Sequence, residues 1–174
     1  MALKNYFELF GLPVQARIDA KVLEAAYQAL QQRVHPDKFA DASEADQRVS
    51  MQWATAVNEA YQNLRHPLRR AVHLLNVHGY DVQAQSNTAM VPGFLIQQMQ
   101  WRESLEEARQ AKDEAKLLVL QSEVKDAQAL QIEHITRLLD ETREFELATV
   151  AVRELMFIEK FKTEVGDAID QLAP

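Results

Sequence analysis

The sequence has 174 residues, 47% of them hydrophobic, which is enough apolar material to give one domain or two small ones a buried core. It contains no cysteine, which excludes disulfides, thiol catalysis and cysteine-ligated metal sites. The formal net charge of −7 argues against nucleic acid and against anionic lipid as partners, since both require clustered cations.

The charge is divided unevenly along the chain. Residues 1–80 carry 9 Lys+Arg and 8 Asp+Glu, a balance of +1, whereas residues 81–174 carry 10 and 18, a balance of −8. This asymmetry indicates two parts with different roles. With only 4 Gly and 5 Pro the composition favours helices with short connections, so we predict an all-α protein. No stretch has the pattern of a signal peptide or a membrane span, and we expect a soluble, cytoplasmic protein.

Four helices are predicted in the first part of the chain, because its apolar residues recur at the period of an α-helix. A short helix runs through Tyr6, and the last begins at Pro67, a residue favoured at the first helical position. Between these two short helices lie two longer ones, which Asp19 and Ser43 are placed to cap. Their apolar stripes are Leu23, Ala26, Tyr27, Leu30 and Val34, then Val49, Trp53, Ala56, Val57, Ala60 and Leu64. The two long helices are expected to form an antiparallel hairpin.

A boundary between two domains is predicted at residues 80–91, where the helical period is lost. Residues 1–79 form the first domain, and 80–91 form the connector. Pro92 then opens a long helix, with Asn87 or Thr88 helping to cap it.

Residues 92–174 have the pattern of a three-helix bundle. The second and third helices are predicted at about 113–140 and 142–170, from their apolar spacing. Their stripes include Leu117, Leu120, Val124, Ala127 and Leu138, then Ala148, Val152 and Leu155.

The corner of the helical hairpin carries the sequence His35-Pro36-Asp37 between the cations Arg33 and Lys38. Proline disfavours a helical conformation in its predecessor and lacks a backbone donor, so the preceding helix must end near His35. An isolated His-Pro-Asp is most often an ordinary turn. Its position between two long amphipathic helices favours a function instead.

The first half resembles a J-domain, the module that stimulates ATP hydrolysis by DnaK-type chaperones. The match covers about residues 4–76. The residues that carry it are Tyr6, Leu9 and Gly11, then His35-Pro36-Asp37, then Asn58, Glu59, Ala60, Tyr61 and Leu64, and finally Pro67, Arg70 and Ala71.

This resemblance implies that Asp37 engages the ATPase domain of the chaperone and relieves a brake on hydrolysis. A carboxylate at this place suits a partner arginine, and Pro36 stiffens the corner that presents it. His35 is expected to hold the loop or to touch the partner. Long-range attraction to an acidic chaperone surface is expected from Lys21, Arg33 and Lys38.

The first helix of the bundle has a second apolar group besides its core stripe. The core stripe comprises Phe94, Gln98, Trp101, Leu105 and Ala108. Leu95, Ile96 and Met99 lie about 100–200° away from it around the helix. The carboxylates of Glu103 and Glu107 share this outer face. From geometry alone, binding of a partner explains this group no better than packing against the first domain or inside a wider bundle does.

Segments 64–71 and 110–115 carry a second resemblance. With them, essentially the whole chain resembles the HscB family, the J-domain co-chaperones of iron–sulfur cluster biogenesis. The resemblance implies that the bundle binds the scaffold protein IscU through Leu95, Ile96, Met99, Gln100, Glu103, Glu107 and Phe157.

The family resemblance also implies that the J-domain delivers IscU to the chaperone HscA and stimulates its ATPase, which promotes cluster transfer. Gln100 stands where the family pattern leads us to expect an acidic residue, and Phe157 lies off the main stripe of the last helix. No cofactor is expected, because a chain without thiolates lacks the usual cluster ligands.

Three alternatives remain open. The sequence has no phosphate-binding glycine loop, zinc-protease motif or nucleophile elbow, so we do not expect an enzyme. His73 and His78 have no clearly placed carboxylate ligand, which favours ordinary histidines over a metal site. A J-protein that serves a different client is the second alternative, and a homodimer through the outer face of the 92–111 helix is the third.

Overall fold

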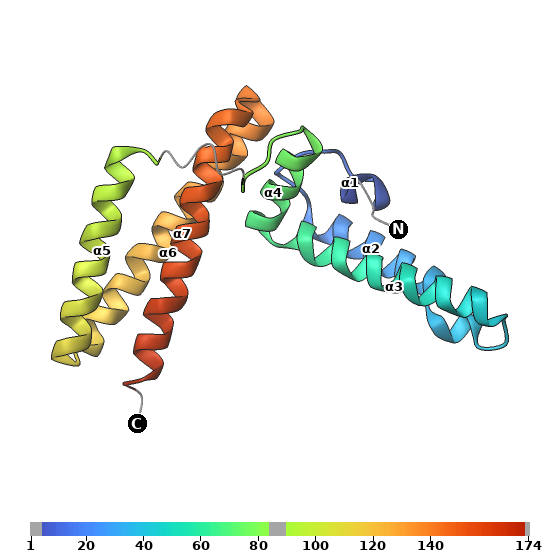
Figure 1. The fold of residues 1–174 in the computed structure, drawn as a ribbon, viewed down its shortest axis with the longest axis horizontal. Coiled ribbons are helices and arrows are strands. Elements are labelled where there is room, and N and C mark those ends of the chain that lie inside the picture. The colour runs from blue at the N-terminus through green and yellow to red at the C-terminus, as the bar shows by residue number, and fades with distance from the viewer. Residues whose placement is uncertain (1–4, 84–89, 173–174) are drawn as a thin grey trace. The chain divides into compact units, whose positions relative to one another are not determined.

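A computed structural model of the protein describes residues 5–83 and 90–172, and the secondary structure of these residues is helical without strands (Figure 1). The all-α prediction is confirmed. The chain divides into two compact units, Met1–Tyr80 and Asp81–Pro174. Within the described residues, no helix is both long enough and apolar enough to cross a membrane.

Helices α2 (Ala20–Val34) and α3 (Glu44–Arg65) lie side by side in the N-terminal unit and form its hairpin (Figure 1). Asp19 and Ser43 cap them as predicted, and each side chain accepts hydrogen bonds from backbone N–H groups of the first turn. The two helices meet along an apolar seam in which the residues with the least exposure are Leu23, Val57, Ala60, Tyr61 and Leu64.

The prediction that Val49 faces inward is wrong. Its side chain is 50% exposed, whereas the next residue, Ser50, is only 3% exposed. Counted from Val57 at about 100° per residue, Ser50 lies about 20° away around the helix and Val49 about 80°. The buried hydroxyl of Ser50 is satisfied, because it donates a hydrogen bond to the carbonyl of Val34 at 2.8 Å.

Two short helices flank the hairpin, α1 (Tyr6–Leu9) and α4 (Pro67–Val77). Arg70 joins three segments of this unit: its Nε donates to the carbonyl of Ala16 and its guanidinium to that of Leu64, each at 2.7 Å. The residue after the C-cap of α4, Gly79, has a φ of +85°, which closes the helix with a left-handed turn.

The C-terminal unit is a three-helix bundle of α5 (Pro92–Ala111), α6 (Glu114–Arg137) and α7 (Phe145–Asp170) (Figure 1). The predicted capping residues of α5, Asn87 and Thr88, lie outside the described residues. A core shared by the three helices comprises Trp101, Leu105, Ala108, Leu117, Leu120, Val124, Ile158, Phe161, Val165 and Ala168.

Both reversals of the bundle use a non-glycine residue in the left-handed conformation. Lys112 has a φ of 52°, and the N–H of Asp113 donates to the carbonyl of Ala108 at 2.9 Å, which closes α5. A π-helical turn, η2 (Leu138–Thr142), follows α6, and Arg143 with a φ of 55° then leads into α7.

The α6–α7 pair carries a buried polar contact. Glu154 of α7 is only 8% exposed, and its Oε2 accepts a hydrogen bond from the side-chain amide of Gln131 on α6 at 2.9 Å. The same amide nitrogen donates to the carbonyl of Ala151 at 2.9 Å. This polar link joins the two helices, and Gln128 of α6 adds a second one through hydrogen bonds with Glu159 and Lys162 of α7.

Part of the predicted connector packs on the bundle. Val82 belongs to the C-terminal unit and is 3% exposed. Its carbonyl accepts a hydrogen bond from Nε of Arg153 on α7 at 2.8 Å. The boundary between the units thus falls between Tyr80 and Asp81, near the start of the predicted 80–91 connector.

Candidate functional site

The His-Pro-Asp corner forms a short 3₁₀ helix, η1 (Pro36–Phe39), directly after α2. As predicted, α2 ends just before His35, at Val34. The imidazole Nδ1 of His35 accepts a hydrogen bond from the backbone N–H of Asp37 at 3.3 Å. The side chains of His35 and Asp37 are 52% and 90% exposed. His35 therefore caps the turn, while the Asp37 carboxylate is presented to solvent.

Two residues of α3 brace this loop, and the sequence analysis missed both. The amide of Gln47 donates to the carbonyls of Ala40 and Ala42, at 3.0 and 3.1 Å. Ser50 holds the last carbonyl of α2, as described above. A polar residue at an inward position of α3 was an available signal for Ser50, but no sequence pattern marks Gln47.

The predicted chaperone-binding residues do not all lie together. Arg33, His35, Asp37 and Lys38 are exposed at one end of the hairpin. Lys21 is exposed in the first turn of α2, 12 residues before Arg33 and therefore about 18 Å away along the helix. The charges available close to the corner are those of Arg33 and Lys38.

Lys21 instead lines a groove at the opposite end of the hairpin, together with Glu24, Tyr61 and Arg65. The hydroxyl of Tyr61 donates a hydrogen bond to the Glu24 carboxylate, which lowers the pKa of that carboxyl. The guanidinium of Arg65 lies 6.0 Å from the centre of the Tyr61 ring. The hydrogen bond between Tyr61 and Glu24 ties α3 to α2 at the end away from the corner.

The apolar group on the outer face of α5 is exposed. Leu95, Ile96 and Met99 have exposed fractions of 45%, 58% and 72%. The predicted polar members of the same site, Gln100, Glu103 and Glu107, are exposed as well. We call these six residues the α5 patch. The other helices of the bundle leave its apolar members exposed, so within this unit they are available for contact.

Phe157 is held in a cluster of aromatic rings. It is half-buried, packs edge-on against Phe94 with ring centres 5.7 Å apart, and stacks on Phe161 at 5.9 Å. The guanidinium of Arg102 lies 5.4 Å from the centre of its ring. Arg102 is a residue near the patch that the sequence analysis did not single out, and Phe157 contributes to the bundle core as well as to the surface.

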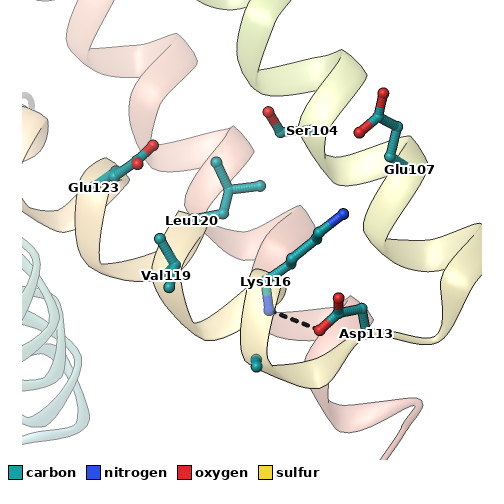
Figure 2. Close-up of a pocket in the computed structure, with 8 residues that line it drawn as sticks. Ser104, Glu107, Asp113, Lys116, Val119, Leu120 and Glu123 are labelled. Carbon is teal, nitrogen blue, oxygen red and sulfur yellow. Dashed lines mark hydrogen bonds between the residues drawn. The ribbon is translucent and has the colours of Figure 1, made fainter.

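A groove with a volume of about 390 Å³ runs between α5 and α6 beside the patch (Figure 2). Its walls comprise Ser104 and Glu107 of α5, Asp113 of the turn, and Ala115, Lys116, Val119, Leu120 and Glu123 of α6. Glu107 belongs to both the groove and the α5 patch, so the two surfaces are continuous.

His73 has a structural role in the N-terminal unit. Its Nε2 accepts a hydrogen bond from the backbone N–H of Tyr6 at 2.9 Å, and its ring stacks on that of Tyr6 with centres 4.1 Å apart. Burial lowers the pKa of His73. In residues 5–83 and 90–172, no three His, Asp or Glu side chains are grouped so that they can hold a metal ion.

The lowered pKa of His73 predicts an acid-dependent loss of stability. Below about pH 6.5, the ordinary pKa of histidine, the unfolded chain binds a proton that the folded chain resists. The contribution of His73 is therefore complete above that pH and falls as the pH drops toward the folded pKa. Between pH 7.5 and 5.5, a His73→Gln variant is expected to lose less stability than the parent.

The measurement is the urea midpoint for unfolding of the N-terminal unit, which the fluorescence of Trp53 reports. The parent and the His73→Gln variant both carry Trp101→Phe for this purpose. Trp53 and Trp101 are the two tryptophans of the chain, so in this background the tryptophan fluorescence comes from the N-terminal unit alone. If the parent and the His73→Gln variant lost equal stability between pH 7.5 and 5.5, His73 would not be the source of the acid dependence.

Comparison with protein-family models matches residues 90–166 to the family described as "HSCB C-terminal oligomerisation domain". Among curated proteins, the chain is 48% identical to the co-chaperone protein HscB homolog of Burkholderia multivorans, with 97% of this chain and 95% of that protein covered. The HscB homolog of Cupriavidus taiwanensis is 49% identical over the same shares.

Two solved structures share the fold. The chaperone HscB from Vibrio cholerae superposes with a TM-score of 0.82 and is 40% identical, over 97% of this chain and 99% of that one. The human co-chaperone protein HscB gives a TM-score of 0.86 at 30% identity, over 93% of this chain and 80% of that one. The likeness therefore extends through both units and not only through the bundle.

Proposed function

The chain belongs to the HscB family of co-chaperones, and from this membership we propose that it delivers the iron–sulfur scaffold IscU to the DnaK-type chaperone HscA. In this proposal the chain performs no chemistry itself. It binds the scaffold with its bundle and raises the rate at which HscA hydrolyses ATP. The resulting change in HscA locks the scaffold in place and promotes transfer of the cluster.

The proposed stimulation of HscA is supported by the geometry of the His-Pro-Asp corner. His35 fixes the turn from within, and Gln47 and Ser50 fix it from α3. A loop held in this way loses little conformational entropy on binding. The exposed carboxylate of Asp37 can then accept charge-assisted hydrogen bonds from an arginine of HscA.

The proposed binding of IscU rests mainly on one observation. Leu95, Ile96 and Met99 are exposed beside carboxylates on α5. Apolar side chains ringed by polar groups are typical of protein interfaces. Removal of these three side chains from water supplies the affinity in the proposal. Glu103 and Glu107 supply attraction to basic residues of the scaffold.

The test is a steady-state ATPase assay with HscA and IscU from the same organism. We expect the chain to raise the rate of HscA by itself, and to raise it further when the scaffold is present. Calorimetric titration of IscU into the chain is expected to show binding in the absence of HscA. The ATPase rate tests the proposed action on HscA, and the titration tests the proposed binding of IscU separately.

Stimulation of HscA without any binding of IscU would support a J-protein that serves a different client. Binding of IscU without stimulation of HscA would refute the proposed action on the chaperone. Failure of both would refute the whole proposal.

A further inference from the structure

The groove between α5 and α6 has the features of a second contact surface for the client. Its floor includes Leu120, which is 3% exposed, and its α6 wall includes Val119, which is 60% exposed. An apolar side chain that enters from solvent would therefore meet aliphatic atoms. The groove lies against the α5 patch, because Glu107 lines both.

The charges at the groove favour a cationic occupant. Carboxylates of Glu107, Asp113 and Glu123 line it, against the single ammonium of Lys116. Asp113 is occupied in part, since its Oδ1 caps α6 by accepting a hydrogen bond from the N–H of Lys116 at 3.0 Å. Glu107 and Glu123 stand on opposite walls, so a lysine or arginine between them would gain from both.

Lys116 is the feature that opposes such an occupant. Its side chain extends from α6 toward α5, into the mouth of the groove (Figure 2). An incoming cation must displace it or accept its repulsion. Lys116 also lies in the first turn of α6, where a cation is disfavoured by the helix dipole, so its removal should not harm the fold.

We propose that the client scaffold crosses α5 and places a lysine or arginine, next to an apolar side chain, into the α5–α6 groove between Glu107 and Glu123. This inference rests on the proposed function, since it extends the same client surface from α5 onto α6. It gives the groove residues Val119, Glu123 and Lys116 roles in binding that the α5 patch alone does not include.

The experiment compares two single-charge changes with opposite expected effects. Glu123→Gln removes an attraction and is expected to weaken binding of IscU about three- to tenfold. Lys116→Gln removes a repulsion and is expected to tighten binding about two- to fivefold. Each effect should shrink in 0.5 M salt, because partly exposed charges are screened. Val119→Thr, which is close to isosteric, is expected to weaken binding without a salt dependence.

Matched controls have the same changes of charge outside the groove. Asp167→Asn on α7 and Lys125→Gln on α6 replace exposed residues that do not line it. Both are expected to leave the dissociation constant within twofold of the parent. Helical content of each variant is checked by circular dichroism.

The possible outcomes are distinct. Opposite shifts for Glu123→Gln and Lys116→Gln support the proposal. No shift in either, or shifts of reversed sign, would overturn it while parent binding keeps the proposed function intact. No binding by the parent would overturn both. Self-association of the chain that the Val119→Thr variant abolishes in sedimentation would assign the groove to a second copy and also overturn it.

Discussion

An Asp37→Asn variant is expected to stimulate the ATPase of HscA at least about tenfold less than the parent, while it binds IscU with unchanged affinity. A hydrogen bond to a charged group contributes about 1.5–3 kcal/mol, which corresponds to roughly 10- to 150-fold. Asparagine keeps the size of the side chain but loses the charge. The turn itself should persist, because His35 caps it through the backbone N–H of residue 37.

The control for this variant is Asp41→Asn, which removes the same charge from an exposed position just after η1. It is expected to stimulate HscA as the parent does. Equal stimulation by the Asp37→Asn variant and the parent would exclude the carboxylate as the trigger. Equal losses in both variants would reduce its role to general electrostatic attraction.

A Leu95→Ala/Met99→Ala variant is expected to lose IscU binding by about 30- to 100-fold, which corresponds to roughly 2–3 kcal/mol. Both side chains are exposed in the free protein, so their truncation leaves the core intact. The loss therefore measures contact with the partner. Stimulation of HscA by this variant in the absence of the scaffold should be unchanged, because the His-Pro-Asp corner is untouched.

The chain offers a closely matched control for the patch. Leu147 and Met156 on α7 are 56% and 38% exposed, so Leu147→Ala/Met156→Ala removes the same two side-chain types from another surface. Its affinity for IscU should equal that of the parent. Comparable losses in the two double variants would contradict a specific α5 patch.

Phe157 is left out of this design for a structural reason. Its ring is packed between Phe94 and Phe161 and lies under Arg102. Truncation to alanine would open a cavity in the bundle as well as remove a surface contact. A loss of binding in that variant would not distinguish the two effects.

Much of the fold could be predicted because local signals agree with each other. The caps Asp19 and Ser43, the proline that ends α2 and the helical periods all depend on neighbouring residues. The corner and the α5 patch could be predicted as candidates for the same reason, because each is a short segment of the sequence.

The parts that were missed depend on contacts between one helix and a loop or a second helix, which helical spacing does not report. Gln47 braces the corner through carbonyls five and seven residues away, and Ser50 does so through Val34, sixteen residues away. The α5–α6 groove exists only because two helices come together. Val49 was predicted to be buried because it lies at the margin of the apolar face of α3. At that margin, a small difference in angle around the helix decides whether a side chain is buried or exposed.

The hydrogen bond from half-buried Gln131 to buried Glu154 affects the alignment of α6 against α7. Apolar side chains along two long helices allow one helix to slide past the other by a turn, about 5.4 Å, with similar contacts. Such a slip would separate the amide from the carboxylate and leave the buried Glu154 without this hydrogen bond. A buried polar group without a partner costs about 1–3 kcal/mol, and more when it is charged. The pair therefore selects one register of the two helices, which an apolar seam alone would specify only weakly.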